Sequence, residues 1–210
     1  MIKKNFLAVL ATLLLGTAII QHSAAPAVAE PPLRGVFADN FIVLEAPAPA
    51  PKADFRALSG DPAKLSDYRG RLVLLNFWAT WCAPCIREMP SLDRLQAELG
   101  PEGLQVVAVS VDRAGAEIVG PFLAELGVTR LDILLDPKFR SARAFSISGL
   151  PATFVIDPEG RLVGGLEGPA EWDSPDALAL LRYYLPEAAS GWPPQSEAGL
   201  QRVGTGTSVE

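Results

Sequence analysis

The chain has 210 residues, with 18 basic and 24 acidic side chains and a formal net charge of −6. Because phosphate binding requires a basic surface, this balance argues against nucleic acid as a partner. The only histidine is His22, near the N-terminus, so the rest of the chain has no imidazole for general-base catalysis or metal ligation.

Residues 1–29 are typical of an export segment. Lys3 and Lys4 give a basic start, residues 6–20 are apolar and uncharged, and Ala27-Val28-Ala29 suits cleavage before Glu30. The alternative is a retained membrane anchor with attachment through residues 6–22, although the strongly apolar part is shorter than the roughly 20 residues that span a bilayer. Both alternatives place the rest of the chain on the periplasmic side of the inner membrane. Cleavage near Ala29 would remove two lysines and no acid, which changes the net charge to −8.

The segments on either side of the central region are expected to be poorly structured. We expect a linker over residues 30–46, with an edge strand between Val36 and Leu44. The alternating alanine and proline of residues 46–52 indicates a semi-rigid spacer. Residues 187–210 offer too little apolar surface to offset the entropy of ordering, so a disordered tail is expected there. The folded domain is expected over residues 47–186.

Within that domain, apolar runs alternate with helical patterns. Three apolar runs predict strands, at residues 72–78, 104–111 and 131–135. Helices are predicted at residues 84–99, 114–126, 139–145 and 175–185. The runs 152–156 and 161–166 predict an antiparallel hairpin. This order of elements predicts an α/β protein, a three-layer α/β/α sandwich around a mixed central sheet.

The only two cysteines stand two residues apart in Trp81-Cys82-Ala83-Pro84-Cys85. A bridge that closes so short a loop removes little freedom from the unfolded chain, so we expect a disulfide that is made and broken. At the start of a predicted helix, unpaired backbone N–H groups and the helix dipole favour a thiolate. We expect Cys82 to be the exposed nucleophile and Cys85 the resolving thiol. A zinc site would need two more Cys or His ligands, so no metal is expected.

Further motifs accompany the dithiol. Asn76-Phe77-Trp78-Ala79-Thr80 precedes it, Glu88-Met89-Pro90 follows it, and Gly149-Leu150-Pro151-Ala152-Thr153-Phe154 comes later. Together these motifs resemble the TlpA/ResA-like branch of extracytoplasmic thioredoxin-fold proteins. The run Gly-Pro-Ala-Glu-Trp-Asp-Ser-Pro at residues 168–175 is similar more narrowly to the TlpA subgroup. The resemblance covers residues 47–185 and implies a thioredoxin-like fold.

The resemblance also implies roles for individual residues. Glu88 matches an acidic residue that adjusts the thiols and assists proton transfer, and Asn76 stands where ordinary thioredoxin has a buried aspartate. The alternative for Glu88 is a solvated charge on the helix surface, paired with Arg87 or Arg94.

A substrate-binding surface is implied beside the dithiol. The Leu150–Pro151 bond is expected to be cis and to face the thiols, with the backbone of Leu150 free to pair with an extended polypeptide. Trp81, Ala83 and Pro84 are expected to contribute contact surface.

The implied activity is that of a thiol:disulfide oxidoreductase acting as a reductant, without a cofactor. The implied substrates are disulfides in copper chaperones or oxidase subunits for TlpA-like members, and in apocytochrome c for ResA-like members. A membrane protein of the DsbD or CcdA kind would supply the electrons.

Other activities remain open. They are a DsbA-like oxidant, a peroxiredoxin-like peroxidase and a non-catalytic binding module. The peroxidase usually has Thr three residues before its reactive Cys, where this chain has Ala79. A Sco-like copper chaperone would need a Cys-x-x-x-Cys spacing and a distal His.

Overall fold

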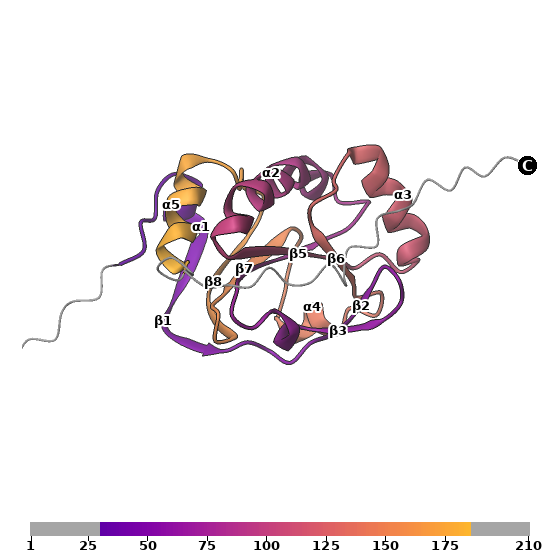
Figure 1. The fold of residues 1–210 in the computed structure, drawn as a ribbon, viewed down its shortest axis with the longest axis horizontal. Coiled ribbons are helices and arrows are strands. Elements are labelled where there is room, and N and C mark those ends of the chain that lie inside the picture. The colour runs from indigo at the N-terminus through magenta and orange to yellow at the C-terminus, as the bar shows by residue number, and fades with distance from the viewer. Residues whose placement is uncertain (1–29, 186–210) are drawn as a thin grey trace, which may run out of the picture. The chain divides into compact units, whose positions relative to one another are not determined.

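A mixed sheet of eight strands organises the computed structural model, which describes residues 30–185 (Figure 1). The strand order is β1-β8-β7-β4-β5-β6-β2-β3. The strands are β1 (Phe41–Pro49), β2 (Asp54–Ala57), β3 (Pro62–Lys64), β4 (Leu72–Trp78), β5 (Leu104–Ser110), β6 (Asp132–Leu135), β7 (Ala152–Ile156) and β8 (Arg161–Glu167). The expected leader or anchor over 1–29 and the expected tail over 187–210 lie outside the described residues.

Helices cover both faces of this sheet. They are α1 (Val36–Asn40), α2 (Ala83–Leu99), α3 (Ala116–Leu126), α4 (Arg140–Ala144) and α5 (Pro175–Tyr184), with short 3-10 helices at η1 (Leu65–Tyr68) and η2 (Gly100–Glu102). Figure 1 shows α2, α3 and α5 on one side of the sheet and α4 on the other. The predicted three-layer α/β/α sandwich is therefore confirmed.

The centre of the sheet matches the apolar runs of the sequence. Every residue of β4 is buried, because β4 lies between β5, with which it is parallel, and β7, with which it is antiparallel. The antiparallel β7–β8 hairpin is as predicted, and the predicted strands β5 and β6 pair in parallel. Long apolar runs identified these strands because a strand covered on both faces has no polar side.

The N-terminal part of this unit is more ordered than predicted. The expected edge strand is present, but it begins at Phe41 and continues through Pro49, so the spacer predicted over residues 46–52 was wrong for its first four residues. The prolines are tolerated because β1 is an outermost strand. Its outer side has no neighbouring strand, so a missing N–H on that side removes no inter-strand hydrogen bond. Ahead of β1, α1 places the buried ring of Phe37 against Trp172, with 5.4 Å between ring centroids.

Two further strands were not predicted. They are β2 and β3, which form the other outer part of the sheet through the pairing of β2 with β6. The outermost strand, β3, also begins with a proline, Pro62.

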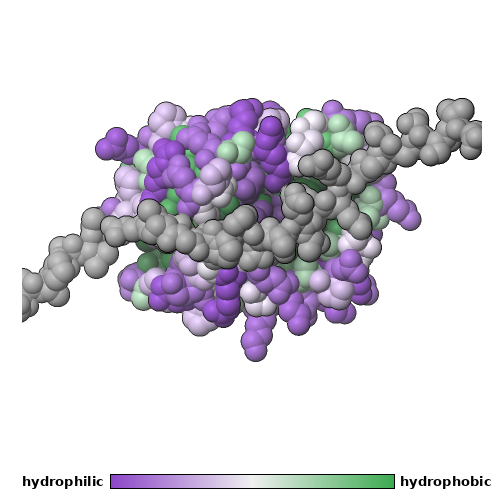
Figure 2. Space-filling view, viewed as in Figure 1, coloured by the Kyte–Doolittle hydropathy of each residue, from purple (hydrophilic) through white to green (hydrophobic). Residues whose placement is uncertain are grey.

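The face of the molecule shown in Figure 2 is mostly polar. It carries small, separate apolar patches between hydrophilic side chains. Among residues 30–185, no helix combines the length and the apolar character needed to cross a membrane.

Candidate active site at the start of helix α2

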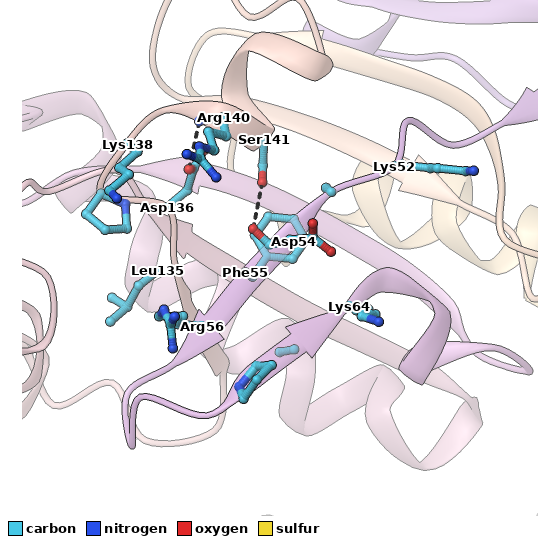
Figure 3. A pocket seen from close by; sticks show the side chains of 14 residues that line it. Lys52, Asp54, Phe55, Arg56, Lys64, Leu135, Asp136, Lys138, Arg140 and Ser141 are labelled. Atoms are coloured by element: carbon cyan, nitrogen blue, oxygen red, sulfur yellow. Dashed lines mark hydrogen bonds between the residues drawn. The ribbon is translucent and has the colours of Figure 1, made fainter.

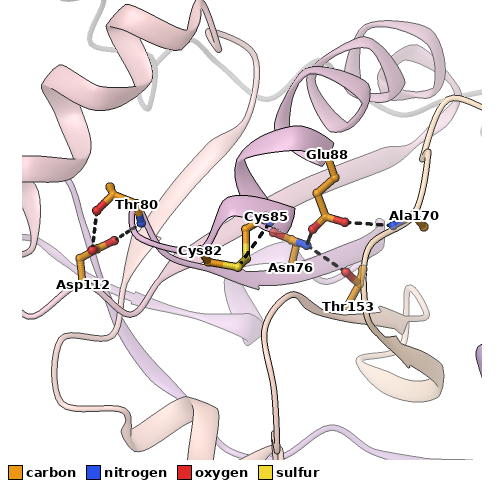
Figure 4. Close-up of a disulfide and its surroundings, with 8 residues drawn as sticks. All are labelled: Asn76, Thr80, Cys82, Cys85, Glu88, Asp112, Thr153 and Ala170. Atoms are coloured by element: carbon orange, nitrogen blue, oxygen red, sulfur yellow. Dashed lines mark hydrogen bonds between the residues drawn. A yellow bond between two sulfur atoms is a disulfide. The ribbon is translucent and has the colours of Figure 1, made fainter.

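Cys82 and Cys85 form a disulfide at the N-terminus of α2, with an S–S distance of 2.03 Å (Figure 4). Cys82 is the N-cap residue of the helix, and its Sγ accepts a hydrogen bond from the backbone N–H of Cys85 over 3.3 Å. The first N–H groups of a helix have no partner within the helix, so a negative charge on this sulfur is stabilised there.

The two sulfur-bearing residues differ in access to solvent. Cys85 is 0% exposed, whereas Cys82 is 6% exposed, which is less than expected for the nucleophile. The Cys82 side chain turns towards the N–H groups of the helix and the other sulfur, and this orientation explains its low exposure. Trp81, at 65% exposed, and the exposed Ala83 stand on either side of it. An incoming group can therefore reach Cys82 more easily than Cys85.

A buried carboxylate holds the loop before the disulfide. Asp112 accepts a hydrogen bond from the backbone N–H of Thr80 over 2.9 Å and another from the Thr80 hydroxyl over 2.7 Å. The hydroxyl of Ser110 donates to the same carboxylate over 2.8 Å. Sequence reasoning missed Asp112. Its position directly after the predicted strand over 104–111 was the only available signal.

Glu88 lies inside the protein, one helical turn after Cys85. It is 2% exposed, and its Oε1 accepts a hydrogen bond from the side-chain amide of Asn76 over 2.7 Å (Figure 4). Its Oε2 accepts one from the backbone N–H of Ala170 over 3.2 Å. The same Asn76 amide donates to the Thr153 hydroxyl over 2.9 Å. The alternative of a solvated surface charge paired with Arg87 or Arg94 was wrong, because the carboxylate faces the sheet.

Burial raises the pKa of Glu88 from 4.5 to about 7. The hydrogen bonds from Asn76 and Ala170, together with the indole of Trp172, act in the opposite direction and lower this pKa, but they do not offset the loss of solvation. A carboxyl group with this pKa exchanges its proton near neutral pH.

The loop between β8 and α5 packs on α2 beside Glu88. The backbone N–H of Trp172 donates to the Ser91 hydroxyl over 3.1 Å, and this hydroxyl donates to the carbonyl of Glu88 over 2.8 Å. Outside this contact, Arg94 forms ion pairs with Glu171, over 3.1 Å, and with Asp173. These contacts hold residues 168–175 against α2. The same run includes Ala170, whose backbone N–H donates to Glu88.

The Leu150–Pro151 bond is cis, as the resemblance implied. Ala152 of β7 pairs with Phe77 of β4, so the preceding residue, Pro151, lies at the end of β4 that leads to Cys82. Pro151 is buried and Leu150 half-buried. Pro84 lies in the first turn of α2, where its missing N–H costs no helical hydrogen bond.

The chain is similar to a known family and to several curated proteins. A model of the AhpC/TSA family matches residues 46–164. The thiol-disulfide oxidoreductase ResA of Bacillus subtilis is 34% identical over 133 residues, which cover 63% of this chain and 73% of that protein. The ResA protein of Geobacillus kaustophilus is 38% identical over 113 residues, but the match spans only 64% of its length and 54% of this chain.

Solved structures confirm the thioredoxin-like fold. A crystal structure from Chlorobium tepidum, assigned as a thiol:disulfide interchange protein DsbE, is 32% identical with a TM-score of 0.58, and the match covers 66% of this chain and 99% of that one. A DsbF homologue from Corynebacterium diphtheriae is 26% identical with the same TM-score of 0.58, and that match covers 71% of this chain and 94% of the other.

Proposed function

Because this chain belongs to the AhpC/TSA family, as a TlpA/ResA-like member of it, we propose that it is a thiol:disulfide oxidoreductase acting through Cys82 and Cys85. One observation carries the proposal. The two sulfurs form a disulfide at a helix N-terminus, with the outer sulfur beside exposed contact surface and the inner residue fully buried.

The reaction begins with the reduced protein. The Cys82 thiolate attacks a disulfide of the partner, a new S–S bond joins the two proteins, and the first partner sulfur leaves as a thiolate that takes a proton from water. Glu88 then accepts the proton of Cys85, and the Cys85 sulfur attacks Sγ of Cys82. The second partner sulfur leaves and is protonated. The partner has gained two electrons and two protons, and this chain holds the disulfide seen in the structure.

We propose that electrons flow from this protein to its partners. The dipeptide between the cysteines is Ala83-Pro84, which lacks the histidine of the strongly oxidising DsbA dipeptide. The proposed substrates are protein disulfides in the assembly of respiratory enzymes: in copper chaperones or oxidase subunits, or alternatively in apocytochrome c. The proposed site is the periplasmic side of the inner membrane, where a membrane protein of the DsbD or CcdA kind supplies electrons.

Redox equilibration tests the activity and its direction. Equilibration in glutathione and dithiothreitol buffers should give a midpoint potential closer to that of thioredoxin, about −270 mV, than to that of DsbA, about −120 mV. A midpoint near the DsbA value would instead support the oxidant. Loss of Cys82 in Cys82→Ser should abolish exchange, and an unchanged rate would reject the mechanism.

A trap variant addresses the substrate. In Cys85→Ser the second attack cannot occur, so the mixed disulfide at Cys82 should persist and carry the partner through purification. The double variant Cys82→Ser, Cys85→Ser is the control, and proteins captured by both variants do not count as substrates.

The family match also favours a second candidate, a thiol peroxidase. Ala79 argues against the peroxidase, because the peroxidase pattern has Thr at this position. Cys85 is buried and bonded to Cys82. A peroxide consumption assay separates the two functions. Turnover that depends on Cys82 and exceeds the rate of disulfide exchange would favour the peroxidase.

A further inference from the structure

All three lysines among residues 30–185 line one cavity of about 350 Å³ at the β2–β3 end of the sheet (Figure 3). They are Lys52, Lys64 and Lys138, and the arginines Arg56 and Arg140 line the same cavity. Figure 3 shows these five cations spread around β2 and the start of α4. The whole chain has net charge −6, so this concentration of positive charge runs against the overall balance.

Few carboxylates offset these charges. Asp54 and Asp136 are the acidic residues of the cavity, and the Asp136 carboxylate already accepts hydrogen bonds from the backbone N–H groups of Arg140 and Ala142. Within the part of the chain that the structure describes, none of the five cations forms an ion pair. The cavity therefore presents positive charge that an anionic group can neutralise.

The cavity and the disulfide lie at the same edge of the sheet. Trp78, at the end of β4, pairs with Ser110, and Ser110 pairs with Leu135, which lines the cavity. Arg56 of β2 pairs with Leu135. Neighbouring strands lie about 4.8 Å apart, so Leu135 is about 10 Å and Arg56 about 14 Å across the sheet from the strand that leads to Cys82.

The interface of a polypeptide docked on Cys82 is wide enough to reach this cavity along the sheet edge. A specific protein interface buries about 800 Å² on each partner, which corresponds to a disc of about 16 Å radius. The cavity also has an apolar part, formed by Phe55, Pro62 and Pro137, which suits a peptide better than a free inorganic anion.

We propose that this cavity is a docking site for an acidic segment of the disulfide-bearing partner. The inference rests on the proposed function, since it names a recognition surface for the same substrates. Rim charges of this kind steer association and discriminate between partners more than they add affinity.

Two matched peptides test the proposal. Each peptide carries one intramolecular disulfide. Four residues after the second cysteine, one peptide has a run of four glutamates and the other a run of four glutamines. Four to five extended residues at about 3.4 Å each span the estimated separation. The measurement is the second-order rate constant for reduction of each peptide by the reduced protein, in a single turnover at low ionic strength. We expect the glutamate peptide to react about 10-fold faster, with the difference shrinking as salt is added.

Charge reversal locates the effect. The triple variant Lys52→Glu, Lys64→Glu, Lys138→Glu should lose the preference for the glutamate peptide. Arg34→Glu is a matched control for Lys138→Glu, because both side chains are exposed and neither forms an ion pair within residues 30–185. Only Lys138→Glu should slow the glutamate peptide. Every variant should reduce 2-hydroxyethyl disulfide, which carries no charge, at the wild-type rate.

Several outcomes would overturn the proposal. Equal rates for the two peptides, or a preference that survives in the triple variant, would show that the cavity does not bind acidic segments. Sedimentation with phosphatidylglycerol vesicles that depends on the three lysines, without any peptide preference, would assign the cavity to lipid headgroups. If wild-type protein reduces neither peptide nor 2-hydroxyethyl disulfide, the proposed function itself fails.

Discussion

The side-chain amide of Asn76 donates a hydrogen bond to the carboxylate of Glu88 over 2.7 Å, inside a layer where both residues are buried. The pair ties β4 to α2 one turn below the disulfide. Because an amide carries no charge, it compensates only part of the cost of burying a carboxylate, and the pKa of Glu88 stays raised at about 7.

The first prediction concerns stability against pH. The folded-state pKa of Glu88, about 7, lies above its unfolded value of 4.5, so the folded state binds more protons between these values. The contribution of Glu88 to the free energy of unfolding is fully present below pH 4.5 and is lost as the pH rises through 7. Between pH 4.5 and 8 the wild type should lose up to about 3 kcal/mol that Glu88→Gln does not lose. Urea unfolding of both oxidised proteins across this range measures the difference, and parallel curves would contradict the raised pKa.

The second prediction concerns reactivity. If Glu88 accepts the proton of Cys85, it must be ionised to act, so the second step of exchange should accelerate as the pH rises through about 7. Glu88→Gln should lose this inflection and slow the step by about 10²-fold or more. Stopped-flow reaction of the reduced protein with glutathione disulfide, followed by tryptophan fluorescence, gives the rates. An inflection that persists in Glu88→Gln would assign it to a thiol.

The third prediction concerns the loop before the disulfide. Asp112→Ala removes the acceptor of the Thr80 N–H and of two hydroxyl groups, so it should lower the free energy of unfolding by about 3 kcal/mol. Thr80→Ala removes one hydroxyl and should cost about 1 kcal/mol. Denaturant unfolding measures both. Equal, small losses would show that Asp112 does not hold the loop.

The fourth prediction tests whether the N-terminal elements belong to the folded unit. Phe37 is fully buried against Trp172, so Phe37→Ala should cost about 3 to 5 kcal/mol. Ile42 is 70% exposed, and Ile42→Ala should change stability by less than about 0.5 kcal/mol. Thermal unfolding compares the two variants, and a small effect of both would mean that α1 does not stabilise the domain.

Local patterns were sufficient for the centre of the fold. β4 and β5 are seven-residue apolar strands, and α5 begins at Pro175, the first residue of its predicted range, where the Ser174 hydroxyl accepts from the Ala177 N–H. β2 and β3 have four and three residues, too short and too polar for a periodic signal. They exist because β2 pairs with β6, almost 80 residues later.

The candidate site was predictable to a similar extent. The two cysteines can be recognised from their spacing in the sequence. The hydrogen bonds of the Glu88 carboxylate, in contrast, come from Asn76, 12 residues earlier, and from Ala170, 82 residues later. No local pattern shows which face of α2 will be covered by such distant groups. Asp112 was missed for the same reason, since an aspartate after a strand is also typical of an ordinary turn.

Both outermost strands of the sheet carry proline, Pro47 and Pro49 in β1 and Pro62 in β3. An exposed strand with a full set of backbone donors is a template on which other chains assemble into fibrils, and each proline deletes a donor from that template. The prolines at the two margins of the sheet therefore reduce its capacity to add a strand from another polypeptide.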